Sequence, residues 1–177
     1  EQLRVDFSRS LAFAQSAHRV AERVGDDHLR ALALRASANA LSVGGNNQGS
    51  IDLHREAIAS FERVGDDREL ARTLSACVQP LLLLGRYDQA LETAERARQL
   101  FAAQGDEIRL ARLENTIGNL LHRQDRFAEA MACYERAHQA LIPLGDADGI
   151  MSVIHNKAVT FTSLNDFREA LAAIRAG

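Results

Sequence analysis

Residues 115–137 read NTIGNLLHRQDRFAEAMACYERA, and the spacing of their apolar side chains decides the fold. These side chains lie on either side of the polar segment 122–126: Ile117, Leu120 and Leu121 before it, and Phe127, Ala130, Met131, Tyr134 and Ala137 after it. Steps of three and four residues are typical of the buried face of an amphipathic helix. The stretch therefore predicts two helices joined by a short turn, which we call helix A and helix B.

The same pattern returns every 40 residues. A glycine followed by an aspartate stands at 25–26, 65–66, 105–106 and 145–146. Glycine can take the left-handed conformation that ends a helix, and aspartate can cap the N-terminus of the next one. Between these markers an aromatic residue precedes an alanine by three positions, at 87 and 90, 127 and 130, and 167 and 170. Each repeat is thus one A–B pair, with helix A near 68–84 and helix B near 87–103 in one of them.

These markers predict an all-α chain that forms a single array over residues 1–177. The array has a lone helix B at 3–24, complete repeats at 28–67, 68–107 and 108–147, and a partial repeat at 148–177. Small residues recur at one position of each helix, where they let helices approach closely. They are Ala38, Val78, Gly118 and Ala158 in helix A, and Ser50, Ala90, Ala130 and Ala170 in helix B. Because the chain starts at Glu1 and stops inside a predicted helix at Gly177, we expect a piece of a longer protein.

Composition supports helix and argues against several partners. Helix-favouring residues dominate, aromatic residues make up 5%, and only two prolines occur. The formal net charge is −3, and the charges are spread along the chain without the basic stripe of a nucleic-acid-binding protein. No apolar run approaches the ~20 residues that a membrane span needs. We therefore expect neither nucleic acid nor a membrane as a partner.

The two cysteines and six histidines show no catalytic or metal-binding spacing. Cys77 and Cys133 belong to no CxxC pair, which favours buried thiols in a reducing compartment over a disulfide and predicts a cytoplasmic location. The histidines have no metal-ligand spacing with cysteines or carboxylates, and we expect each to be solvated. The glycine-rich segment 44–49 lacks the Lys-Ser/Thr of a phosphate loop and fits a turn between two helices. These patterns predict no enzyme, no cofactor and no metal.

The stretch 115–137 resembles a tetratricopeptide repeat (TPR). Gly118, Phe127, Ala130 and Ala137 match the small, aromatic and alanine positions of the family pattern, and Tyr87, Ala90 and Ala97 match them one repeat earlier. Repeat 28–67 departs from it, with Asn47 and Ser50 at the aromatic and first alanine positions. The period of 40 rather than 34 is similar to that of long-repeat members such as kinesin light chains. HEAT and armadillo repeats share this period, but they do not predict the aromatic and alanine positions.

The resemblance implies a right-handed α-solenoid of antiparallel helix pairs, a TPR superhelix, whose A helices line a concave groove that binds a protein or peptide. Helical periodicity independently places a polar stripe on the A helices, opposite their apolar side. From this stripe the predicted peptide-binding residues are Arg35, Asn39, Arg72, Ser75, Gln79, Arg112, Asn115, Asn119, His122, Arg123, His155 and Asn156.

Within the stripe, the carboxamides at positions 39, 79 and 119 each offer a donor and an acceptor to the backbone of an extended segment. The arginines are suited to acidic side chains or a terminal carboxylate, so the expected partner includes acidic peptides. Simple solvation of an exposed helix face explains the same residues and stays open at this point.

A second function is a structural or regulatory spacer, or an oligomerisation segment, of a larger multidomain signalling protein. Arrays with this Gly-Asp punctuation resemble those attached to caspase-like CHAT proteases and to bacterial STAND-type signalling proteins. In that case we expect a homodimer through exposed terminal helices, because the cut end of a helical array presents apolar surface.

Overall fold

A computed structural model describes residues 12, 16, 19–20 and 23–164, and within this part all regular secondary structure is helical. The helices are α2 (Asp27–Val43), α3 (Asn47–Val64), α4 (Asp67–Leu83), α5 (Tyr87–Gln104), α6 (Glu107–His122), α7 (Phe127–Leu144) and α8 (Ala147–Ser163). The even-numbered helices are the predicted A helices, and α3, α5 and α7 are B helices. The all-α prediction is confirmed. The helix predicted at 3–24 and the second helix of repeat 148–177 lie largely outside the described residues.

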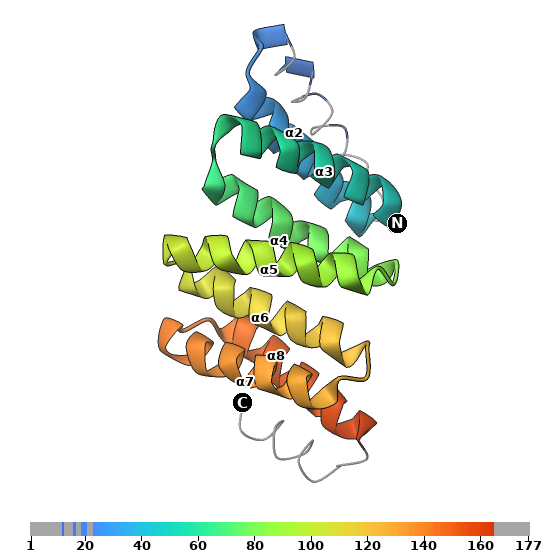
Figure 1. Cartoon of the computed structure of the whole chain (residues 1–177), viewed down its shortest axis with the longest axis vertical. Coiled ribbons are helices and arrows are strands. Elements are labelled where there is room, and N and C mark those ends of the chain that lie inside the picture. Colours follow the sequence, from blue (N-terminus) through green and yellow to red (C-terminus); the bar gives the residue numbers. More distant parts are fainter. Residues whose placement is uncertain (1–11, 13–15, 17–18, 21–22, 165–177) are drawn as a thin grey trace. The chain divides into compact units, whose positions relative to one another are not determined.

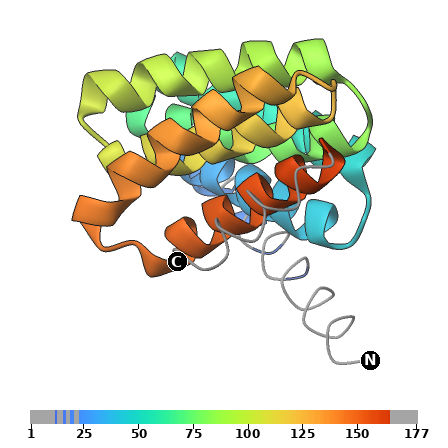
Figure 2. The same cartoon turned by 90° about the horizontal axis from the view of Figure 1, so that it is seen from below.

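The chain divides into two compact parts, residues 1–100 and residues 101–177, and α5 crosses the boundary. In the N-terminal part α2 packs against α3, and α3 packs against α4 (Figure 1). In the C-terminal part α6 packs against α7, and α7 packs against α8; the pair α6 and α7 lies side by side in both views (Figures 1 and 2). Successive A helices also touch within each part, α2 with α4 and α6 with α8.

The Gly-Asp markers end and begin helices as predicted. Gly65 and Gly145 adopt left-handed conformations, with φ of 71° and 67°, directly after α3 and α7. The aspartate that follows each of the four marker glycines accepts a hydrogen bond from the backbone N–H three residues later, and so caps the next A helix. The four such bonds are Leu29 to Asp26 (2.9 Å), Glu69 to Asp66 (2.9 Å), Arg109 to Asp106 (3.2 Å) and Gly149 to Asp146 (3.3 Å). Local capping thus sets where each A helix starts.

The core consists of the predicted small residues and the large side chains that face them. Ala38, Val78, Ala90 and Ala130 are fully buried. Gly118 of α6 lies against the ring of Tyr134 of α7 so closely that a Cβ at Gly118 would lie 2.4 Å from Cε1 of that ring. The absence of a side chain at this one position therefore sets how close α6 and α7 come.

Candidate functional site

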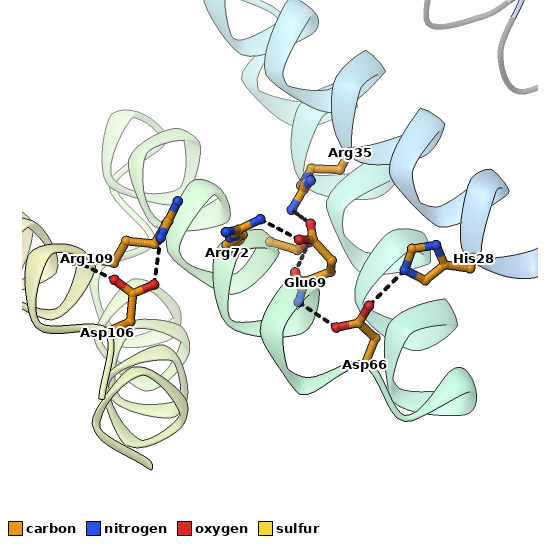
Figure 3. Close-up of polar contacts among 8 residues, drawn as sticks. His28, Arg35, Asp66, Glu69, Arg72, Asp106 and Arg109 are labelled. Carbon is orange, nitrogen blue, oxygen red and sulfur yellow. Dashed lines mark hydrogen bonds and ion pairs between the residues drawn. The ribbon is translucent and has the colours of Figure 1, made fainter. Parts of the chain in front are cut away.

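In the N-terminal part, two predicted ligand-binding arginines are engaged by the protein itself. Nη1 of Arg35 on α2 lies 2.6 Å from Oε2 of Glu69 on α4, and Nη1 of Arg72 lies 2.5 Å from Oε1 of the same carboxylate (Figure 3). The three side chains are 19%, 12% and 26% exposed for Arg35, Glu69 and Arg72. A partly buried pair of this kind resists solvent competition better than a surface pair. Arg35 therefore holds α2 against α4, while Arg72 pairs with Glu69 within α4, so both guanidinium groups are engaged by the protein.

The N-terminal end of α4 carries a second contact to α2. Nε2 of His28 donates to Asp66 at 2.8 Å, so the aspartate that caps α4 also binds the preceding A helix (Figure 3). The pKa of Asp66 lies below its ordinary value, chiefly because the backbone N–H of Glu69 donates to the carboxylate, with a further contribution from His28. The ring of His28 meets Phe61 edge-on at 5.7 Å, and the guanidinium of Arg35 lies 5.9 Å from the centroid of the same ring.

The prediction that every histidine is solvated is wrong for His54. Its side chain is completely buried on α3, where Nε2 lies 3.2 Å from Oδ1 of Asn39 and Nδ1 lies 3.3 Å from Oγ of Ser50. Burial lowers its pKa to about 4. Position 54 is equivalent to position 134, where α7 carries the buried Tyr134. Alignment of the repeats therefore indicates that position 54 lies in the core.

The last turns of α2 and α4 expose a surface made of Asn39, Val43, Gln79 and Leu83, which we call the carboxamide–aliphatic surface. Val43 is 77% exposed and Leu83 is 52% exposed, while Leu82 is buried in the core. On each helix an amide side chain precedes an aliphatic one by four residues, so the two lie on one face. The polar stripe predicted Asn39 and Gln79. It did not include Val43 and Leu83, because both are apolar, although they occupy equivalent positions 40 residues apart.

In the C-terminal part, most predicted residues connect α6 to its neighbours. Arg112 donates to both carboxylate oxygens of Asp146, at 2.6 and 2.7 Å, and this pairing is the main reason why the pKa of Asp146 is lowered. Asn115 donates to Oγ of Ser152 and accepts from Nδ2 of Asn156, both at 3.0 Å. These bonds connect α6 to α8.

Two further predicted residues of α6 are also engaged. His122 Nδ1 lies 3.0 Å from Oγ1 of Thr160 on α8, and the hydroxyl of Tyr134 on α7 donates to Oδ1 of Asn119 at 2.8 Å. Arg123 and His155 are exposed, and Ser75 on α4 is half-buried. The predicted stripe therefore divides into residues that connect helices and a smaller set that faces solvent.

Described residues also line a surface cavity in each part. In the C-terminal part a cavity of about 280 Å³ is lined by predicted residues Arg112 and Asn115 together with Thr116, Leu141, Asp148, Gly149 and Ser152. In the N-terminal part α3, α4 and α5 surround a cavity of about 430 Å³ with an apolar base of Ile51, Leu74, Cys77 and Leu81. Because three helices form this second cavity, the residue periodicity within any one helix does not predict it. Burial raises the pKa of the Cys77 thiol to about 11, which keeps it protonated near neutral pH.

Both cysteines are buried and neither forms a disulfide, as predicted. Among the described residues no group of three or more His, Cys, Asp or Glu side chains is placed to hold a metal ion. Over the same part of the chain, every helix is too short or too polar to cross a bilayer. The expected absence of catalysis and of cofactors stays a prediction.

Comparison with known proteins finds the same architecture in tetratricopeptide-like repeat proteins. Residues 109–176 match the family model of the tetratricopeptide repeat. The structure of BtubC (BKLC) from P. vanneervenii is similar with a TM-score of 0.86 at 17% identity, covering 99% of this chain and 73% of that one. A putative kinesin light chain of Podosopora anserina with nearly identical TPR-like repeats gives 0.79 at 12% identity, covering 99% and 86%. YrrB, a TPR protein with an unusual peptide-binding site, gives 0.60 at 19% identity, covering 96% and 75%.

No curated protein sequence matches the chain. At these identities the structural likeness shows the fold alone, and it agrees with the predicted class of antiparallel helix pairs. Residues 109–176 therefore match the tetratricopeptide repeat, and the chain has the all-α fold of TPR-like repeat proteins.

Proposed function

We propose that the chain is a protein–protein interaction module whose A helices bind an extended segment of a partner protein. The observation that carries this proposal is the carboxamide–aliphatic surface, where α2 and α4 expose the same pair of side-chain types at equivalent positions. An isolated exposed aliphatic residue needs no explanation, but a repeated polar and apolar pair on neighbouring helices is typical of a binding surface. YrrB, a protein of this fold, is described as having a peptide-binding site, which supports the class of ligand.

The spacing of these residues suits an extended chain. Packed helices lie about 8–10 Å apart, and an extended chain advances about 3.3 Å per residue. An extended segment crossing from α2 to α4 therefore advances by about three residues between the two helices. Gln79 has both amide groups available among the described residues, and Asn39 keeps its Nδ2 donors because only its Oδ1 is used by His54. Val43 and Leu83 would cover apolar side chains between these hydrogen bonds.

The partner need not be strongly acidic. Glu69 forms ion pairs with Arg35 and Arg72, and Asp146 forms an ion pair with Arg112. An acidic ligand would have to displace these carboxylates, and only Arg123 of the predicted arginines is exposed without an ion pair in the described part of the chain. We therefore expect binding to depend on amide and apolar contacts, and to change little with salt.

In this proposal the chain itself catalyses no reaction and takes no cofactor. Cys77 and Cys133 are buried and form no disulfide, which supports a reducing compartment such as the cytoplasm. The finer features of the sequence-based interpretation, a bacterial signalling context and a homodimer, have no structural observation in their favour comparable to the carboxamide–aliphatic surface.

A selection from displayed random peptides tests the proposal without a known partner. Peptides selected on the full chain should lose at least tenfold in affinity for the double variant Q79A/L83S. They should bind normally to the matched control Q99A/V64S, which changes an exposed glutamine of α5 and an exposed aliphatic residue of α3. Equal binding to both double variants would contradict the proposal. Light scattering on the same samples detects a second copy of the chain as the occupant of the surface, which would also contradict it.

A further inference from the structure

His54 is held in its neutral form by the groups around it. Oδ1 of Asn39 can only accept a hydrogen bond, so Nε2 of His54 carries the proton and donates to it. Nδ1 is then unprotonated and accepts from the hydroxyl of Ser50, which is itself fully buried. The ring thus links α3 to the exposed amide of Asn39 on α2, one of the four residues of the carboxamide–aliphatic surface.

Burial disfavours a positive charge on this ring, and among the described residues it outweighs a backbone hydrogen bond with Ser50 that favours the protonated form. The charged group that acts on His54 is Arg35 of α2, which has the same sign, and neither of its hydrogen-bonding partners is a carboxylate. A buried charge without a counter-ion is strongly unfavourable. Protonation in the folded state therefore conflicts with both burial and Arg35.

The C-terminal part provides an internal comparison. Tyr134 occupies the equivalent position on α7, and its hydroxyl donates to Asn119 as Nε2 of His54 donates to Asn39. Burial raises the pKa of Tyr134 to about 12, so this side chain stays neutral throughout the acidic range. The hydrogen bond between helix A and helix B is therefore made by an acid-sensitive imidazole in His54 and by an acid-insensitive phenol in Tyr134.

We propose that His54 is an acid-sensitive latch, whose protonation opens the α2–α3 pair and releases Asn39 while the α6–α7 pair stays closed. Helical repeats contact mainly their neighbours, so one pair can open without the rest of the chain unfolding. The latch is independent of any ligand. Its consequence, weaker partner binding at acidic pH, rests on the proposed function.

The direction in which pH changes the stability of the α2–α3 pair follows from the lowered pKa of His54. The pKa of His54 is lowered in the folded chain, so the stability of the pair is complete above the ordinary value of 6.5 and decreases as the pH falls from there towards about 4. Between pH 7.5 and pH 5 the opening equilibrium of α2–α3 should increase by about thirtyfold, as linkage gives for these two pKa values.

Two measurements on the full chain test the latch. In an NMR titration the imidazole of His54 should titrate far below the ordinary value of 6.5, and titration of His54 near 6.5 would overturn the proposal. Hydrogen exchange, corrected for the intrinsic effect of pH, should show opening of 29–64 but not of 113–141 on going to pH 5. Equal responses of the two segments would also overturn it.

Two variants separate the latch from general acid sensitivity. H54Q cannot titrate, and A38G/H54Y copies the pair Gly118 and Tyr134 of the C-terminal part, which leaves room for the larger ring. Whichever variant folds should lose the increase in opening at pH 5. If it retained the full increase, His54 would not be the cause.

A selected peptide distinguishes the latch from the proposed function. A peptide that binds wild type at pH 7.5 should lose affinity at pH 5 for wild type but not for the H54 variant. If the α2–α3 pair opens at acidic pH but no selected peptide maps to the carboxamide–aliphatic surface, the proposed function is rejected and the latch is retained. Binding that weakens equally in wild type and variant would reject the latch and leave the proposed function.

Discussion

The contact between Gly118 and Tyr134 shows how one residue sets the distance between two helices. The equivalent positions one repeat earlier hold Val78 and Ala94, and those two repeats earlier hold Ala38 and His54, all buried. A smaller residue on helix A therefore accompanies a larger one on helix B. The total volume between the helices stays similar, which is the property that packed cores conserve.

We predict that G118A destabilises the chain by about 1–3 kcal/mol, because the new methyl group would overlap the ring of Tyr134. Urea unfolding followed by circular dichroism measures this loss. The double variant G118V/Y134A copies the pair Val78 and Ala94, and it should be more stable than G118V alone. Strict additivity of the two substitutions would show that the two side chains do not share one space.

Sequence periodicity was sufficient to identify Gly118 and its equivalents as packing positions, because a small residue at a fixed place in every repeat has few other causes. It was not sufficient for His54. A lone histidine is most often solvated, and only its alignment with Tyr134 indicates a core position. The electrostatic consequence depends on Arg35 and Ser50, whose proximity is a property of the packed helices.

Each A helix of the described part begins at an aspartate that caps it. Asp66 and Asp146 also bind the preceding A helix, through His28 and Arg112 respectively. These partners lie 38 and 34 residues before the aspartate. A fixed sequence period therefore predicts the cap but does not single out the partner, because neighbouring turns of the preceding helix lie within reach.

We predict that D66A lowers the free energy of unfolding by about 1 kcal/mol through loss of the cap. D66N should lose less, since asparagine also caps a helix. Because the pKa of Asp66 is lowered in the folded chain, its contribution is present above the ordinary value of 3.8 and is lost as the pH falls below that value. Urea midpoints between pH 6 and pH 2.5 should fall less steeply for D66N than for wild type. Parallel curves would exclude Asp66 as a source of acid sensitivity.

Helix boundaries were predicted to within one residue where the markers are local. The predicted ranges 68–84 and 87–103 compare with Asp67–Leu83 for α4 and Tyr87–Gln104 for α5. The candidate site was predicted less well. Periodicity identifies the helix face on which Arg35 or Asn115 lies. Whether that face binds a ligand or contacts the next A helix depends on how the A helices pack against each other.

Over the chain as a whole, the repeat gives both the architecture and the proposed role. Side chains that recur at the same place in successive repeats form the core, the contacts between A helices, or the carboxamide–aliphatic surface. In the C-terminal part the equivalents of that surface are Asn119, Arg123, Val159 and Ser163, so its composition changes along the chain. The proposed binding of a peptide therefore concerns the N-terminal part, where the carboxamide–aliphatic surface lies.

The most direct test of this account maps a selected peptide on the full chain by NMR, from the shifts of assigned amide signals. Residues 36–43 and 76–83, the last two turns of α2 and α4, should shift most, and these shifts should disappear in Q79A/L83S. Shifts centred instead on residues 51–62 and 89–96, around the cavity of α3, α4 and α5, would contradict the account.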